Sequence, residues 1–260
     1  MQVFITSPIS LERHLHRASV FARRVILIED QVETSGAFVL HHLIKRSLSI
    51  ESSEIVIFVA LSKPFSHYDR ILRKLGCNLV AQRENGKFIF IDMLKLECPD
   101  GDEGNGVGGG LIDLYRKIQK FVEVNASTSP ELNRCITVMM DDLSLLEVAA
   151  KGSSTYVLDF LHYCHTLTSE NGCSLVVLNH SDIYSSKTGS TLILQMEYLA
   201  DVVVQAEPLV TGLATDVHGQ LTVLNKGAID EHGGVRSKLH NFHFKVKENS
   251  VEYFYPGSRA

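Results

Sequence analysis

Short apolar runs that alternate with amphipathic segments constrain the fold of this chain most. Five runs are rich in β-branched residues and suit strands buried on both faces: Val25–Ile28, Ile55–Leu61, Phe88–Ile91, Ile136–Met140 and Leu175–Leu178. Helical spacing of apolar residues recurs before and between them, after a possible N-cap at Ser10 and then over Ala37–Leu48, Phe65–Leu75, Leu111–Val124, Leu143–Ala150 and Tyr156–Leu167. Strands that alternate with helices predict a mostly parallel sheet with right-handed crossovers.

From Asp201 onward the pattern changes. The segments "ADVVVQAEPL", "HGQLTVLNKG", "HNFHFKVKEN" and "SVEYFYPG" predict successive strands joined by short turns, and therefore an antiparallel run. A parallel core followed by antiparallel C-terminal hairpins is the layout of RecA-like domains. We therefore predict an α/β, RecA-like fold in a single domain over residues 1–260. The Gly-rich acidic stretch 99–110 is expected to be a mobile loop within it, because the α/β alternation resumes afterwards.

Composition and charge exclude several function classes. The 260 residues are 45% hydrophobic, which suits a packed core, and the net charge of −5 argues against nucleic acid gripped over a whole face. No apolar run approaches a membrane span, and the N-terminus has no long apolar region, so neither membrane insertion nor secretion is expected. The five Cys form no CxxC pair and indicate reduced thiols in a cytoplasmic or nuclear protein without a metal site. A solvated helix face best explains the basic cluster Arg13, Arg17, Arg23 and Arg24.

The stretch "RRVILIEDQVETSGAFVLHHLIKR", residues 23–46, has the strand, turn and helix of a phosphate-binding loop. Alignment of the pattern GxxxxGK[ST] on Gly36 places Gln31 at the first Gly, Ala37 at the Lys and Phe38 at the hydroxyl position. One of the four positions survives. The missing Lys would reach the β- and γ-phosphates, and the missing hydroxyl would bind Mg²⁺.

The charges of this loop also oppose a phosphate. Each of the carboxylates of Glu29, Asp30 and Glu33 would cost roughly 1–4 kcal/mol at ~4 Å from a phosphate, and no Lys or Arg follows before Lys45. We therefore predict an ordinary turn that does not hold ATP, with Thr34 or Ser35 as the N-cap of the next helix.

The run "CITVMMDD" ends in Asp141 and Asp142, where a nucleotide site has the acid that holds Mg²⁺ through water. A structural alternative is stronger without the phosphate loop. Ser144 and Glu147 match a capping box for the following helix, and the two acids would favour its positive end.

Later polar residues carry weaker signals. Asn179 and His180 stand where RecA-like proteins place a sensing residue, or they form a satisfied pair at a strand end. In a RecA-like ring Lys187 would face the central hole and could touch an RNA backbone. Lys226 could reach the nucleotide of a neighbouring subunit, although Ala228 replaces the usual Arg two positions on. For both lysines a solvated side chain is the alternative.

Several blocks resemble a known family. They are "GAFVLHHLIKRSL", "FVALSKPFSHYDRILRKLGCNL" and "RENGKFIFIDML", and the most specific part is "FSHY" at Phe65–Tyr68 followed by "KLG" at Lys74–Gly76. The chain is similar to sixth subunits of the Elongator complex from about Val25 to the C-terminal hairpins.

This resemblance implies a RecA-like fold without an intact phosphate loop. It implies assembly with the fourth and fifth Elongator subunits into a hetero-hexameric ring, and contact with the remaining subunits. The complex modifies the wobble uridine of tRNA through a radical-SAM and acetyltransferase-like subunit, while the ring binds and releases tRNA. We expect this chain to be a non-catalytic subunit with no cofactor, in cytoplasm and nucleus. An active ATPase with an unconventional site and a free-standing adaptor remain alternatives.

Overall fold

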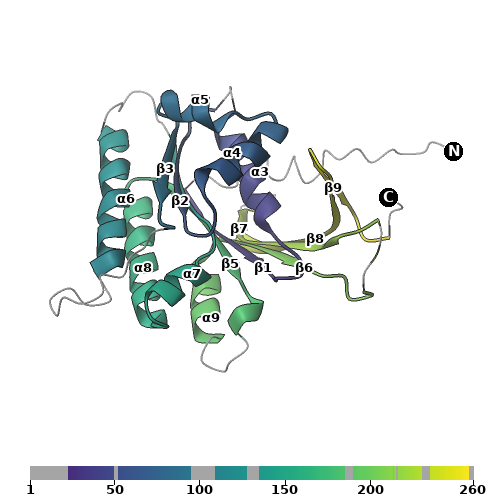
Figure 1. Ribbon diagram of the computed structural model, residues 1–260. Coiled ribbons are helices and arrows are strands. Elements are labelled where there is room, and N and C mark those ends of the chain that lie inside the picture. The colour runs from purple at the N-terminus through teal and green to yellow at the C-terminus, as the bar shows by residue number, and fades with distance from the viewer. Residues whose placement is uncertain are drawn as a thin grey trace.

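The computed structural model describes residues 23–49, 52–94, 109–127, 135–184, 190–212, 214, 216–229 and 235–257. Within them one nine-stranded sheet has the order β3-β2-β4-β5-β1-β6-β7-β8-β9 (Figure 1). Its strands are β1 (Val25–Asp30), β2 (Ile55–Ala60), β3 (Phe88–Asp92), β4 (Ile136–Met140), β5 (Ser174–His180), β6 (Val202–Glu207), β7 (Gly219–Ile229), β8 (Val235–Val246) and β9 (Val251–Phe254).

Strand β6 joins the two parts of the sheet. It pairs in parallel with β1, as β1 does with β5, and it pairs antiparallel with β7. Strands β8 and β9 continue the antiparallel part and bend away from the parallel core (Figure 1). The predicted mostly parallel sheet with antiparallel C-terminal strands is therefore confirmed.

Helices cover both faces of the parallel core. One face carries α3 (Ala37–Ser47), α4 (Phe65–Lys74) and α5 (Leu79–Glu84), and the other carries α6 (Gly109–Ser127), α7 (Ser144–Ala149), α8 (Ser154–Glu170) and α9 (Ser190–Leu199). Successive strand residues supply the two cores in turn, because side chains alternate across a strand. Ile26 and Ile28 lie in the core beside α3, whereas Leu27 lies in the core beside α8.

The five predicted parallel strands and the five predicted helices from Ala37 onward are present. Helices α5 and α9 were not predicted, and Gly109 and Gly110, expected in the loop 99–110, instead begin α6. The rest of that loop, 99–108, and the expected first helix lie outside the described residues.

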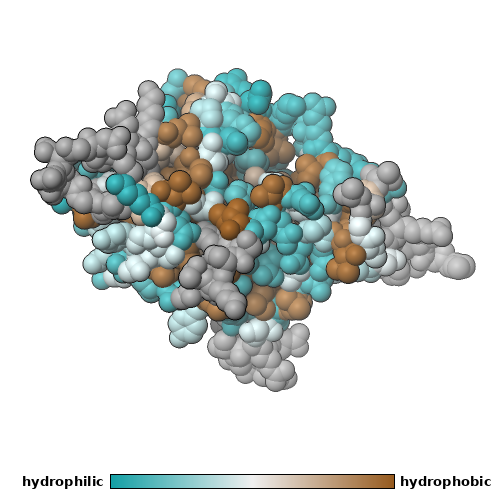
Figure 2. Space-filling model, turned by 60° about the horizontal axis from the view of Figure 1, so that its bottom comes forward, coloured by the Kyte–Doolittle hydropathy of each residue, from teal (hydrophilic) through white to brown (hydrophobic). Residues whose placement is uncertain are grey.

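The described surface mixes polar and apolar residues. Figure 2 shows several separate hydrophobic patches among hydrophilic residues on the face turned forward. Of the helices that are described, none combines the length and apolar character needed to span a membrane. The four Cys in this part of the chain are unpaired and three are buried, as the sequence predicts.

Candidate functional site

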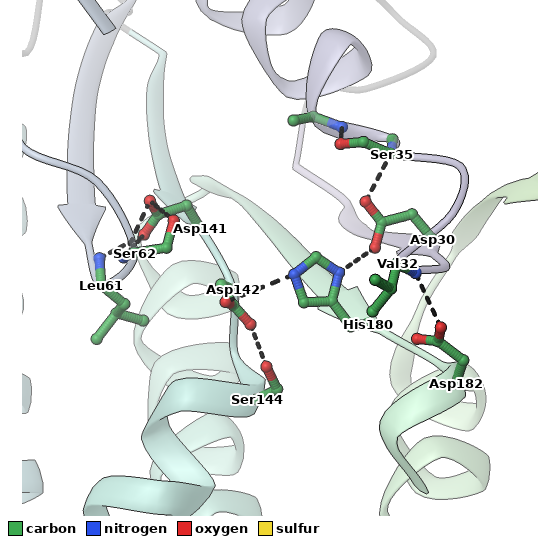
Figure 3. A network of polar contacts seen from close by, with 12 residues as sticks. Asp30, Val32, Ser35, Leu61, Ser62, Asp141, Asp142, Ser144, His180 and Asp182 are labelled. Carbon is green, nitrogen blue, oxygen red and sulfur yellow. Dashed lines mark hydrogen bonds and ion pairs between the residues drawn. The ribbon is translucent and has the colours of Figure 1, made fainter. Parts of the chain in front are cut away.

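Three polar side chains meet where β1, β4 and β5 end, which is the edge where open α/β sheets bind ligands. Asp30 is the last residue of β1, His180 is the last of β5, and Asp142 follows β4. His180 Nδ1 contacts Asp30 Oδ1, and His180 Nε2 lies 3.5 Å from Asp142 Oδ2 (Figure 3). The imidazole therefore bridges two carboxylates from different strands.

The second oxygen of Asp30 occupies the start of α3. Asp30 Oδ2 accepts a hydrogen bond of 2.7 Å from the Gly36 backbone N–H, and the Asp30 side chain is fully buried. An anion at a helix N-terminus is stabilised by the free N–H groups and the helix dipole. In a phosphate-binding loop a phosphate takes this place, whereas here the chain supplies its own carboxylate.

Other amides of the loop are also satisfied internally. The Val32 N–H donates to Asp182 Oδ2 at 2.8 Å, and the Thr34 N–H donates to the Gln31 carbonyl at 2.9 Å, which closes a tight turn. A phosphate nest needs consecutive N–H groups that point together toward an anion. In this loop the amides are spread over separate internal acceptors.

The residues aligned with the phosphate-loop pattern have structural roles. A Cβ at Gly36 would lie 3.2 Å from the Asp30 Cβ and 3.2 Å from an Ile28 methyl, so close packing favours the surviving Gly. Phe38, at the lost hydroxyl position, is 9% exposed and packs on Phe244, with ring centroids 4.7 Å apart. Gln31, at the first Gly position, forms an isolated bridge with Thr34.

The predicted N-cap of α3 was wrong. The helix begins after Gly36, not after Thr34 or Ser35, and Gly36 makes no side-chain cap. Ser35 Oγ still accepts the Ala37 N–H at 3.2 Å. The Asp30 carboxylate accepts the N–H of Gly36, the residue that stands in the N-cap position.

Burial and charge set the protonation of this network. Hydrogen bonds to Asp142 and then to Asp30 raise the pKa of His180 to about 10. Burial pushes the pKa of Asp142 upward, but hydrogen bonds from His180 and Ser144 outweigh it and hold that pKa below its usual value. An imidazolium between two carboxylates therefore joins the ends of three strands at neutral pH.

Of the three acids in the loop region, only Asp30 caps the helix. Glu29 is 4% exposed, accepts a 2.9 Å hydrogen bond from Gln205, and has a pKa raised by burial. Glu33 is exposed in the turn. Asp30 therefore opposes a phosphate by occupying the helix start, and His180 balances its charge.

Asp141 turns to the opposite side of the β4 end, toward β2. Its carboxylate accepts the Leu61 N–H, the Ser62 hydroxyl at 2.9 Å and the Tyr68 hydroxyl. The side chain is 2% exposed, and burial raises the pKa of Asp141 despite these hydrogen bonds. The residue aligned with the metal-holding acid is therefore engaged by neutral donors of the chain itself.

The predicted capping box of α7 was wrong. The residue before the helix is Leu143, which makes no side-chain cap, and the Ser144 hydroxyl donates to Asp142. Glu147 does not turn back to the helix start but accepts the Ser154 hydroxyl at 2.6 Å. Asp142 has a φ of 51°, a left-handed conformation that Asp tolerates better than most residues. The polar residues after β4 therefore serve the bridge to β5 and the α7–α8 turn.

The remaining candidate residues differ in outcome. Lys187 lies outside the described residues. Lys226 is half-buried, and its ammonium group donates a hydrogen bond to the Glu197 backbone carbonyl near the end of α9. Its suggested contact with a neighbouring subunit stays a prediction, and its alternative as a freely solvated lysine was wrong. His180 pairs with the two acids, in agreement with a satisfied strand end, and Asn179 beside it is fully buried.

Sequence reasoning missed two roles. It read Asp30 as a repulsive charge and not as the internal cap of α3, and it used Tyr68 only as part of "FSHY". A hint for Asp30 was present, because a strand that ends in an acid before a helix start has a carboxylate within reach of free N–H groups. The part of the chain that is described contains no group of three His, Cys, Asp or Glu side chains arranged to hold a metal ion.

The sequence is similar to those of known proteins along most of its length. Residues 14–248 match the family described as Elongation complex protein 6. Elongator complex protein 6 of Xenopus laevis is 30% identical over 241 residues, with 87% of this chain and 88% of the relative covered. The protein of that name from Homo sapiens is 29% identical over 238 residues, with 86% and 88% covered.

A likeness to a solved structure concerns the fold alone. The KaiC-like protein of the hyperthermophilic archaeon Pyrococcus horikoshii OT3 superposes with a TM-score of 0.58 at 13% identity and covers 90% of each chain. The predicted RecA-like fold class is confirmed.

Proposed function

This chain belongs to the Elongation complex protein 6 family, as its resemblance predicted, and we propose that it acts there as a non-catalytic subunit. As a member it has the other Elongator subunits as partners. In this proposal it forms a hetero-hexameric RecA-like ring with the fourth and fifth subunits. The ring supports modification of the tRNA wobble uridine by binding, positioning or releasing tRNA in cytoplasm and nucleus.

The observation that carries the non-catalytic role is the internal anion. The Asp30 carboxylate holds the Gly36 N–H at the start of α3, and His180 neutralises this carboxylate from the other side. A phosphate at this place would have to displace a buried, paired charge, and removal of a partner from such a pair is costly. Ala37 and Phe38 add no cation and no hydroxyl to offset that cost.

The second supporting observation is Asp141. Four side-chain and backbone donors from the β2–α4 segment occupy its carboxylate, and burial favours its protonated form. An acid that holds Mg²⁺ through water needs a charged, accessible carboxylate. The two halves of a nucleotide site are therefore both replaced by contacts within the chain.

Titration of a fluorescent ATP analogue with Mg²⁺ into the purified chain tests this proposal. We expect no saturable binding up to millimolar nucleotide. The Ala37→Lys variant restores the missing lysine and should also fail to bind, because Asp30 still occupies the helix start. A micromolar dissociation constant for the unaltered chain would favour an active ATPase with an unconventional site.

The partner side of the proposal has its own test. Co-expression with the fourth and fifth Elongator subunits should give one discrete assembly by size-exclusion chromatography with light scattering. A chain that stays monomeric at micromolar concentration, with no uptake of these subunits, would instead indicate a free-standing adaptor. In the assembled ring, Lys187→Glu should weaken tRNA binding and lower its salt dependence, while assembly stays intact.

A further inference from the structure

Helices α6 and α8 lie side by side on one face of the sheet, at the end far from the C-terminal strands (Figure 1). Between them is a hollow of about 350 Å³ that is distinct from the edge where Asp30 and Asp141 lie. Its lining side chains come from both helices and are almost all apolar or aromatic: Leu111, Ile112, Tyr115, Tyr156, Asp159, Phe160 and Tyr163. We call this hollow the α6–α8 groove.

Large apolar and aromatic side chains of the groove are exposed to solvent. Ile112 is 50% exposed, Tyr156 is 47% exposed and Tyr163 is 61% exposed, so large side chains stand on its rim. Phe160, which is 3% exposed, is a buried member of the lining. Large aromatic side chains that stay half exposed are typical anchors of protein interfaces.

The polar chemistry of the groove points to a cation. Asp159 is an exposed carboxylate, and the lining contains no Lys, Arg or His. The rings of Tyr115 and Tyr163, in the same lining, have centroids 5.7 Å apart. Tyrosine faces attract ammonium and guanidinium groups, and a nearby carboxylate adds a Coulomb attraction.

The openness of the groove favours a polypeptide over a small molecule. Small ligands usually have most of their surface buried in their pocket. Here the rim residues are about half exposed, so a small ligand would remain wet on one side. A peptide segment brings its own further residues to cover the rim.

We propose that the α6–α8 groove docks a segment of another Elongator subunit, with a Lys or Arg side chain against Asp159 and the tyrosines and apolar residues on either side. Membership of a multi-subunit family supplies the partner, and the groove chemistry supplies its character. The inference goes beyond the proposed function, because it depends neither on the degenerate nucleotide site nor on tRNA.

Substitutions in the full chain, co-expressed with the other Elongator subunits, test the docking. The double variant Tyr156→Ser/Tyr163→Ser should reduce the retention of at least one subunit about tenfold or more after a salt wash. The matched control is Tyr198→Ser, which alters a tyrosine that is 87% exposed on α9, outside the groove. Thermal unfolding of each isolated variant should stay within a few degrees of the unaltered chain, since none of these residues is in the core.

Charge reversal tests the cation. Asp159→Lys should weaken retention more than Asp159→Asn does, and the gap should narrow as salt is raised. Asp113→Lys on α6 is the control, because Asp113 is exposed and lies outside the lining. A photo-crosslinking residue at Tyr163 should join this chain to a subunit peptide that contains Lys or Arg between apolar residues.

Several outcomes would overturn the proposal. Unchanged retention of every subunit in the double tyrosine variant would do so, as would equal effects of Asp159→Lys and Asp113→Lys. A crosslink from position 163 to a second copy of this chain, or to its own segments, would assign the groove to a different occupant. None of these experiments measures nucleotide binding. If the docking proposal is wrong, the proposed non-catalytic role is therefore unaffected.

Discussion

Asp141 and Asp142 follow the same strand, yet their carboxylates turn to opposite sides and are stabilised by different means (Figure 3). Asp141 faces β2 and is bound by neutral N–H and O–H donors. Asp142 faces β5 and shares the imidazole of His180 with Asp30. Burial raises the pKa of Asp141, whereas contacts with His180 and Ser144 lower that of Asp142.

The difference divides the edge into two halves. The half at β1, β4 and β5 contains an imidazolium shared by two carboxylates, so its contribution depends on protonation and on all three groups being present. The half at β2 depends on several neutral hydrogen bonds to Asp141, so the loss of one donor leaves the others in place. A carboxylate held by one shared cation should therefore be sensitive to a single substitution, and one held by several neutral donors should tolerate the loss of one donor better.

The largest expected effect is on the charged half. His180→Ala removes the cation between Asp30 and Asp142 and leaves the fully buried Asp30 carboxylate with the Gly36 N–H but without a charged partner. Loss of one member of a buried pair typically costs 3–5 kcal/mol, and we expect about 3 kcal/mol because the His180 side chain is 28% exposed. Urea unfolding followed by circular dichroism measures this loss.

His162→Ala is the matched control for that measurement. His162 is exposed on α8, and alanine is a better helix former, so its replacement should change the unfolding free energy by less than about 0.5 kcal/mol. Equal losses in the two variants would show that the bridge between the strands contributes little.

The next effect is a pH dependence confined to the charged half. The His180 pKa is raised from 6.5 to about 10, so the folded state binds the proton more tightly than the unfolded state. The stabilisation is therefore complete below pH 6.5 and is lost as the pH rises through 10. Relative to His180→Gln, the unaltered chain should lose about 2 kcal/mol of unfolding free energy between pH 6 and pH 10, a value reduced for solvent screening.

Subtracting the unfolding free energy of His180→Gln from that of the unaltered chain removes the contribution of lysines, tyrosines and thiols that titrate in the same pH range. A parallel fall in both proteins would place the proton elsewhere.

The sequence predicts the frame of this edge better than its contacts. Strand ends follow from apolar runs and helix starts from spacing, so Asp30, Asp142 and His180 could each be assigned to the end of a strand. Which of these side chains meet depends on the order of the strands in the sheet. Strand β1 lies between β5 and β6, although it is far from both in sequence. The side to which Asp141 and Asp142 turn depends on a positive φ at Asp142 that no residue pattern specifies.

Two helices show the same limit from another direction. Helix α5 has six residues, too few for a clear period, and α9 begins directly after a segment rich in Ser and Thr. The predicted capping box is absent because Ser144 lies inside α7 and donates to Asp142, while Glu147 accepts the hydroxyl of Ser154. Local patterns predict elements, whereas partners brought together by the fold decide where polar side chains bond.

The smallest expected effect is on the neutral half. Tyr68→Phe removes one hydroxyl donor from Asp141 and keeps the ring, which packs on Phe58 with centroids 4.7 Å apart. Leu61 and Ser62 still donate to the carboxylate, so the buried group is not left without partners. We therefore expect a loss of about 1 kcal/mol, well below that of His180→Ala. Tyr198→Phe, at an 87% exposed position, controls for removal of a hydroxyl that bonds to water and should cost close to nothing. A loss from Tyr68→Phe as large as that from His180→Ala would break the distinction between the two halves, because a single neutral donor would then matter as much as the shared imidazole.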